Sequence, residues 1–240
     1  MNKEKIEQVI IRFSKLFIKD KNYYAFDYAL PHKIDEKGKK RYEKPPWFVP
    51  QEINLGKYEH HLGLMYPKHD WGLILPPINE KGEASYGGID VDVYDQPELI
   101  ERVVKQIYDE KLPLAPCYSN SHGLHLYFFT KGLMSATNIV STLKNYNKHL
   151  GTKAKEIFPK QTKLKWLEKK KRFEYGNGIL LPYRSCINSD GEQLLTNKES
   201  YLKPESKKEQ TPENPWIKNS DLETGTIEEF LDYAEGIQED

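Results

Sequence analysis

The alternation of apolar and polar positions predicts strands in the middle of the chain, with helices between them. Residues 89–94 alternate Ile, Val and Val with Asp, Asp and Tyr, and residues 124–130 alternate in the same way. Apolar residues recur at helical spacing in three segments, residues 3–19, 97–107 and 137–150. A short apolar stretch at 114–118 completes the order strand, helix, strand, turn and strand. This order is typical of an α+β fold with helices on one side of a sheet.

Short-range signals add further boundaries. The apolar runs 62–65 and 71–75 are predicted strands, and Pro76 and Pro77 end the second. Asp95 is the expected N-cap of the helix that begins near Pro97, because proline is favoured in the first turn of a helix.

Asp90 and Asp92 share the polar face of the first alternating strand. Residues two apart on a strand lie roughly 6.6 Å apart, and like charges at that spacing cost stability unless a cation lies between them. Hard oxygen ligands on a rigid strand suit Mg²⁺ or Mn²⁺, including a pair of such ions roughly 3.5–4 Å apart. The alternative is a solvated strand edge, since Asp-x-Asp is common by chance.

His125 lies on the polar side of the second alternating strand. If the two strands are neighbours, His125 shares a face with Asp90 and Asp92. A lone histidine on a strand is more often structural, but the turn at 119–123 directly precedes this one. Glycine lets backbone approach a ligand, and serine hydroxyls with turn amides form an anion-binding concavity. The candidate anion contacts are therefore Ser119, Ser121, Gly123 and His125.

Basic residues are concentrated in two segments of a chain that is balanced overall, with 36 Lys and Arg against 36 Asp and Glu. The first is a predicted loop tip around residues 37–41. The second spans residues 160–172, which hold seven basic residues and one acid, with Trp166 and Phe173 interleaved. Such segments are usually solvated, but beside carboxylates and an anion-binding turn they also suit a nucleic-acid backbone. The candidate nucleic-acid contacts are Lys39, Lys40, Arg41, Lys163, Lys165, Lys169, Lys170, Lys171 and Arg172.

Composition predicts an intracellular protein. Cys117 and Cys186 lie far apart and outside any Cys-x-x-Cys pattern, so reduced thiols are expected. The histidines form no zinc signature. The first twenty residues carry eight charges and no apolar run of the length that a signal peptide or a membrane span needs. We therefore expect a soluble protein that does not enter a membrane.

The C-terminal part differs in composition from the rest. Residues 205–215 are polar, and residues 221–240 hold eight acids and no base. This predicts a domain over residues 1–195, followed by a linker and an acidic tail over 196–240. A short amphipathic helix is expected in the tail on Ile227, Phe230, Leu231 and Ala234. The helix would pack on the body, cover the basic segment as a mimic of nucleic acid, or bind a partner.

Four motifs, taken in order, resemble the catalytic core of the archaeo-eukaryotic primase superfamily. They are the Asp90-x-Asp92 strand, Ser119-x-x-x-Gly123-x-His125, Glu156-Ile-Phe-Pro-Lys-Gln, and Gly176-Asn-Gly-Ile-Leu-Leu-Pro-Tyr. The resemblance covers about residues 60–185 and is closest to the primase-polymerases of phages, plasmids, and conflict or CRISPR-associated systems. It implies an N-terminal α/β part joined to an antiparallel sheet like that of an RNA-recognition motif, with the active site in the cleft between them.

The resemblance implies a nucleotidyltransferase that acts as a DNA primase or primase-polymerase in the cytoplasm of a prokaryotic cell. Asp90, Asp92 and Glu156 would bind two Mg²⁺ or Mn²⁺ ions. His125 and the 119–123 turn would contact the triphosphate of an incoming nucleoside triphosphate, and the template would be single-stranded DNA. Lys160 and Arg184 would contribute further phosphate or template contacts.

Two departures from the family pattern matter. Several relatives have serine at the position of Gly123, so the hydroxyl contact falls to Ser121 or Ser119, or is absent. No zinc module and no helicase motif is present, so unwinding is left to a helicase acting in trans. Two alternatives stay open: another metal-dependent nucleotidyltransferase or phosphodiesterase, and a non-catalytic module that binds single-stranded nucleic acid.

Overall fold

The structure is a computed structural model. It describes residues 1–17, 24–29, 32–34, 40–42, 51–52, 55–63, 71–92, 96–119, 123–184, 186–187, 200–205 and 221–239. The strands that precede residue 55 are described by their backbone pairing. No helix within these ranges is long and apolar enough to cross a membrane.

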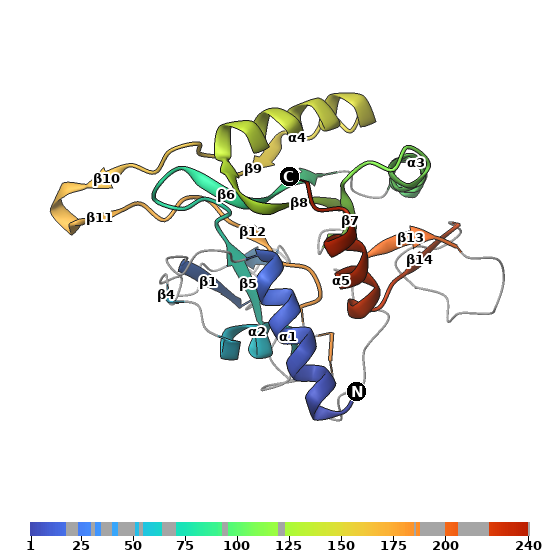
Figure 1. The fold of residues 1–240 in the computed structure, drawn as a ribbon, viewed down its shortest axis with the longest axis horizontal. Coiled ribbons are helices and arrows are strands. Elements are labelled where there is room, and N and C mark those ends of the chain that lie inside the picture. The colour runs from blue at the N-terminus through green and yellow to red at the C-terminus, as the bar shows by residue number, and fades with distance from the viewer. Residues whose placement is uncertain are drawn as a thin grey trace.

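An antiparallel sheet forms the centre of the described fold (Figure 1). Its elements follow in the chain as β6 (Glu83–Val91), α3 (Pro97–Asp109), β7 (Ala115–Tyr118), β8 (Leu124–Ser135), α4 (Ala136–Leu150) and β9 (Glu156–Phe158). The strands lie in the order β7-β8-β6-β9, and each neighbouring pair is antiparallel. Strand, helix, strand, strand, helix, strand is the split βαβ arrangement of ferredoxin-like folds. The predicted α+β class is confirmed.

Helices α3 and α4 cover one face of this sheet (Figure 1). Ile89 and Leu126 on the strands pack with Val103 of α3 and Ile139 of α4 in one buried cluster. Side chains return to the same face every 3.6 residues in a helix and every two residues in a strand. The apolar residues of each element therefore lie on the face that meets the other elements. Gly87 allows the close approach of α4, since a Cβ at this position would lie 2.6 Å from Cγ2 of Ile139.

The opposite face of the sheet packs on α1 (Lys3–Phe17). Tyr86, Tyr127 and Phe129 of the sheet surround Phe17, with ring centroids 5.1–5.9 Å apart. Edge-to-face contacts of this kind add to the stabilisation from burial. This aromatic core occupies one half of the face, and the other half carries the polar residues of the candidate site.

A second sheet lies beside the aromatic core (Figure 1). It has the order β12 (Ile179–Leu180), β5 (Trp71–Leu75), β1 (Tyr24–Ala29) and β4 (Gln51–Glu52), with antiparallel pairing throughout. The strand predicted at 71–75 is confirmed. The strand predicted at 62–65 is wrong at its start, because Leu62 is the last residue of α2 (Leu55–Leu62). A four-residue apolar run does not by itself distinguish the end of a helix from a strand.

The buried His61 joins α2 to the second sheet. Its Nδ1 accepts a hydrogen bond from the amide of Leu73 at 3.1 Å, and its Nε2 lies 2.7 Å from the carbonyl oxygen of Pro182. Because an amide only donates and a carbonyl only accepts, these bonds assign the ring proton to Nε2. His61 therefore has a structural role in this fold.

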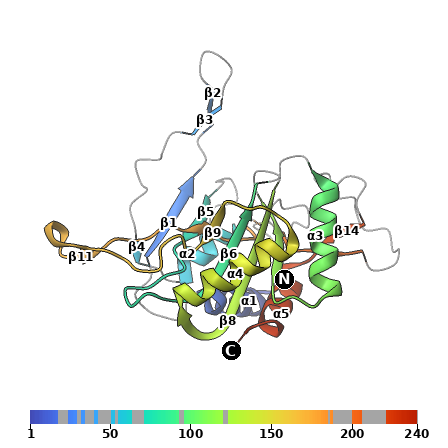
Figure 2. The same cartoon turned by 90° about the horizontal axis from the view of Figure 1, so that it is seen from above.

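Two short antiparallel hairpins lie away from the body of the protein (Figure 2). The first pairs β2 (His32–Ile34) with β3 (Lys40–Tyr42). The second pairs β10 (Trp166–Leu167) with β11 (Arg172–Phe173), through the 3₁₀ turn η1 (Glu168–Lys170). We call residues 163–175 the basic arm.

The C-terminal helix α5 (Ile227–Gly236) packs on the body of the protein (Figure 1). Its apolar residues share the buried cluster that contains Phe13 and Phe17 of α1. Arg12 of α1 also binds Asp232 and Glu235 of α5, at 2.6 and 2.8 Å. Of the three alternatives for the amphipathic helix in the tail, packing on the body is the one observed.

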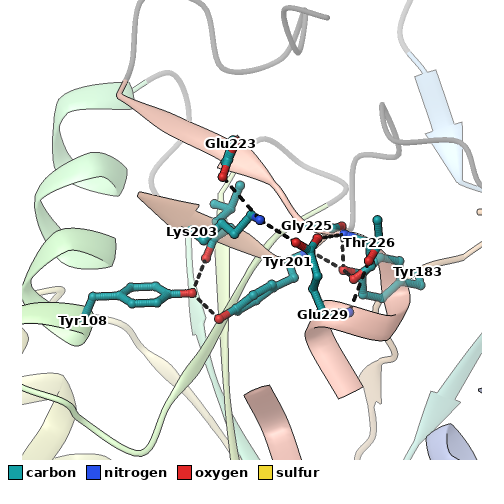
Figure 3. Close-up of polar contacts among 9 residues, drawn as sticks. Tyr108, Tyr183, Tyr201, Lys203, Glu223, Gly225, Thr226 and Glu229 are labelled. Atoms are coloured by element: carbon teal, nitrogen blue, oxygen red, sulfur yellow. Dashed lines mark hydrogen bonds and ion pairs between the residues drawn. The ribbon is translucent and has the colours of Figure 1, made fainter. Parts of the chain in front are cut away.

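Polar contacts fix the start of α5 (Figure 3). Thr226 and Glu229 form a capping box, in which each amide donates to the other side chain. Lys203 of β13 (Leu202–Pro204) binds Glu229, and also Glu223 of β14 (Leu222–Thr224). Burial disfavours the charged form of Glu229, but its hydrogen bonds with Lys203 and the Thr226 amide outweigh burial, and the pKa of Glu229 is lowered.

Candidate active site

A row of four residues crosses the central sheet from edge to edge. Asp90 of β6 lies directly opposite His125 of β8 and also directly opposite Glu156 of β9. His125 in turn lies opposite Cys117 of β7. Directly opposite residues of antiparallel strands project from the same face of the sheet. Cys117, His125, Asp90 and Glu156 therefore share one face, and we call this set the carboxylate row.

Exposure increases along the carboxylate row. Cys117 is buried, the side chains of His125 and Asp90 are 11% and 21% exposed, and that of Glu156 is 42% exposed. Asp92 follows the end of β6 and is exposed. Asp92 lies two residues beyond Asp90 and outside the strand, so its position near the row follows from the chain and not from strand pairing. The acidic end of the row is thus accessible from solvent.

Two ion contacts join members of the site. Nε2 of His125 lies 3.4 Å from Oδ1 of Asp90, and the contact is an ion pair when the imidazole is protonated. Nζ of Lys160 lies 2.6 Å from Oε1 of Glu156. The same ammonium is 4.9 Å from the ring centre of Phe158. The structure therefore brings together four residues that the sequence predicts as site residues, Asp90, His125, Glu156 and Lys160.

The turn before β8 is closed by Ser119. The amide of Ser119 donates to the carbonyl of Gly123, and the amide of Gly123 donates to Oγ of Ser119, both at 2.9 Å. A Cβ at position 123 would lie 2.4 Å from the carbonyl oxygen of Val91, so no side chain fits there. Glycine is therefore the residue that fits at position 123. Ser121 lies outside the described residues.

The second sheet adjoins the carboxylate row through Gly88. A Cβ on this residue would lie 2.8 Å from Cδ1 of Ile179 in β12. Gly88 is two residues before Asp90 on the same face of β6, so its missing side chain admits β12 next to the row. Arg184 follows β12 in a loop and is buried against Gly72 of β5, where a Cβ would lie 2.7 Å from its Cδ. The side chain of Arg184 therefore packs on the second sheet.

The basic arm projects from the body, as both overall views show (Figures 1 and 2). Trp166 is 41% exposed and meets Phe173 edge to face at 5.1 Å. The guanidinium of Arg172 lies 3.7 Å from the ring centre of Tyr175. The arm also carries the predicted contacts Lys163, Lys165, Lys169, Lys170 and Lys171, all exposed. Within the arm, Lys171 binds Glu168 at 3.2 Å.

The other predicted basic segment is only partly described. Lys40 and Arg41 belong to β3, where Arg41 pairs with Lys33 of β2. Lys39 lies outside the described residues, as does Asp95. The N-cap of α3 is Gln96, whose side chain makes no capping bond, so the prediction of Asp95 at this position is wrong. Pro97 does begin the helix, as expected.

Asp90, Asp92 and Glu156 offer the carboxylate oxygens that Mg²⁺ and Mn²⁺ prefer. Within the described part of the chain, however, no three acidic, histidine or cysteine side chains converge on one point in a way that could hold a metal ion. Glu156 is instead bound to Lys160. The carboxylate oxygens suit such ions by their chemistry, and Asp90 and Glu156 share a face of the sheet. Convergence would require the side chain of Glu156 to exchange Lys160 for the ion.

Sequence reasoning assigned no role to Tyr127, which lies beside His125. Its hydroxyl is 3.3 Å from Nδ1 of His125 and 2.5 Å from the carbonyl oxygen of Leu180 in β12. The alternation of residues 124–130 already directs Tyr127 to the face of His125. The contact with Leu180 depends on a different sheet, which the alternation does not predict.

Comparison with models of protein families and with curated proteins finds no match to this chain.

Proposed function

We propose that this protein is a primase-polymerase of the archaeo-eukaryotic primase type. The observation that supports this most is the pairing of Asp90 with both His125 and Glu156 across three strands of one sheet. Three of the four motifs that suggested the family are far apart in the sequence, yet each contributes a residue to one face of this sheet. The split βαβ order of the central sheet agrees with the expected RNA-recognition-motif-like part. The second sheet beside it agrees with an additional N-terminal part.

In this proposal Asp90, Asp92 and Glu156 hold the divalent ions. Two such ions, when bound, supply positive charge to the reacting phosphoryl group and to the pyrophosphate that leaves. His125 binds the triphosphate of the incoming nucleotide, and the amides of Ser119 and Gly123, which bond within the turn, hold the shape of the turn beside it. Lys160, once released from Glu156, adds a cation close to the same phosphates. The site thus positions the nucleotide by charge and by hydrogen bonds.

The basic arm holds the single-stranded DNA template in this proposal. Lysines contact phosphates without regard to sequence, and an exposed Trp166 offers a surface on which a base stacks. Such contacts suit an enzyme that copies any template. The proposed partners are single-stranded DNA and nucleoside triphosphates in the cytoplasm, with a helicase acting in trans.

Primer extension on single-stranded DNA with Mg²⁺ or Mn²⁺ tests the proposal. Wild type extends the primer, whereas Asp90→Ala and Asp92→Ala do not. Asp109→Ala is the matched control, since Asp109 is an exposed aspartate of α3, on the helix side of the sheet. If wild type binds single-stranded DNA and never adds a nucleotide, the protein is a binding module. Cleavage of DNA without nucleotide addition would indicate a phosphodiesterase.

A further inference from the structure

The hydroxyl of Tyr127 connects His125 to the second sheet. It lies 3.3 Å from Nδ1 of His125 and 2.5 Å from the carbonyl oxygen of Leu180. A carbonyl oxygen only accepts hydrogen bonds, so the hydroxyl proton is donated to Leu180. The hydroxyl oxygen can then only accept from Nδ1. Nδ1 of His125 therefore donates to Tyr127 in this arrangement.

This assignment decides which atom of His125 faces the carboxylate row. With Nδ1 bonded to Tyr127, Nε2 is the ring nitrogen directed at Asp90, 3.4 Å from Oδ1. The two ring nitrogens of histidine differ in function, and the bond made by one determines the state of the other. The two aromatic rings are perpendicular, at 88°, with centroids 6.0 Å apart.

We propose that Tyr127 is a positioning residue that holds Nε2 of His125 toward the carboxylate row. Its hydroxyl accepts from Nδ1 and so orients the imidazole, and through Leu180 it ties that orientation to β12. This role rests on the proposed function, in which His125 binds the triphosphate. Tyr127 itself is buried and touches no substrate in that function.

The hydroxyl can be removed without removing the ring. The ring of Tyr127 packs edge to face on Phe17 at 5.9 Å and stacks on Phe129 at 6.2 Å. Tyr127→Phe keeps both ring pairs and deletes only the hydrogen bonds. The substitution therefore separates the positioning role from the packing role.

Tyr86 provides a matched control. It is fully buried on the same face of the neighbouring strand, and it also packs on Phe17. Its hydroxyl donates to the carbonyl of Leu75 in the second sheet at 2.7 Å. Tyr86→Phe thus removes the same kind of bond between the same two sheets. It differs from Tyr127→Phe in leaving the bond to His125 in place.

The experiment is side-chain ¹⁵N NMR of the full chain, which detects whether Nδ1 of His125 carries a proton and how fast that proton exchanges with water. The signals of His125 are assigned by their disappearance in His125→Asn. We expect a slowly exchanging Nδ1 proton in wild type and in Tyr86→Phe, and a rapidly exchanging one in Tyr127→Phe. The same preparations give nucleotide-addition kinetics, in which Tyr127→Phe raises the KM for the nucleotide about tenfold and Tyr86→Phe does not.

An Nδ1 without a proton in wild type, or an Nδ1 proton that exchanges equally fast in Tyr127→Phe, would overturn the role of Tyr127. Equal effects of both tyrosine variants on KM would also overturn it, because they would report only a weaker connection between the two sheets. The NMR measurement needs no activity. If wild type adds no nucleotide, the proposed function fails, while the exchange of the Nδ1 proton still decides whether Tyr127 orients His125.

Discussion

Glu156 of β9 lies directly opposite Asp90 of β6, while its carboxylate is bound to Lys160. The backbone of Glu156 is therefore fixed by the sheet, and its side chain is held by a flexible ammonium group. This combination suits a residue that must exchange one cation for another. Exposure of the Glu156 side chain keeps that exchange accessible from solvent. The proposed metal site would form at the end of the row where the carboxylates are accessible.

Replacement of Gly123 tests the close approach between the turn and β6. A methyl group at this position meets the carbonyl oxygen of Val91 at 2.4 Å. Overpacking of this kind costs about 1–3 kcal/mol. We therefore expect Gly123→Ala to lower the free energy of unfolding by that amount in urea titration, and to reduce nucleotide addition. Gly132→Ala is the control, since nothing lies within 4 Å of a Cβ there. Equal stability of the two variants would show that the turn has room to move.

Charge reversal in the basic arm tests its role in template binding. Lys169 and Lys170 are exposed in η1, and replacing both by glutamate adds repulsion to DNA phosphates. Each phosphate that a protein neutralises on a single strand contributes about 0.7 to the slope of log K against log salt. We expect the double variant to bind single-stranded DNA more weakly in fluorescence anisotropy, with a smaller slope.

The control for the arm is charge reversal of Lys144 and Lys148. They are exposed on α4, and they change the net charge by the same amount. If the two double variants bind single-stranded DNA equally, the arm does not hold the template.

Alkaline pH tests the burial of the C-terminal helix. Burial raises the pKa of Tyr233 to about 12. An unfolded tyrosine titrates near about 10, so folding stability is complete below that pH and is lost as pH rises toward 12. The decrease is at most about 1.4 kcal/mol per pH unit for one group. Thermal unfolding of Tyr233→Phe should therefore show a weaker decline between pH 10 and pH 12 than wild type.

A Tyr233→Phe variant whose decline equals that of wild type would mean that Tyr233 does not contribute. Burial also raises the pKa of Tyr183 and of Tyr201. Part of the alkaline decline should therefore persist in the variant. Both tyrosines hold the segment that leads into α5, as Figure 3 shows.

The periodicity of the sequence predicted the elements that position the site. Residues 89–91 and 124–130 lie in strands whose alternate residues project to opposite faces of the sheet, and this alternation indicated that His125 and Asp90 would share a side. The helices α3 and α4 were equally readable from their apolar spacing. These patterns depend only on residues close together in the sequence, so they can be recognised without knowledge of the fold.

Other features depended on the packing of distant segments. β9 spans only Glu156–Phe158, which is too short to show an alternation of apolar and polar residues. The expectation that Glu156 lies near Asp90 came from the family resemblance alone. The bond of Tyr127 to Leu180 joins two sheets, which no local pattern reveals. The need for glycine at position 123 became clear only once Val91 lay beside it.

A double-mutant cycle between Asp90→Asn and Glu156→Gln tests the central claim most directly. The readout is the rate of nucleotide addition on a primed single-stranded template. Residues that act as one unit show non-additive effects on the rate. We expect each single variant to be about a hundredfold slower or more, and the double variant to be little worse than either. Effects that multiply in the double variant, or a Glu156→Gln variant as active as wild type, would contradict a single site on the carboxylate row.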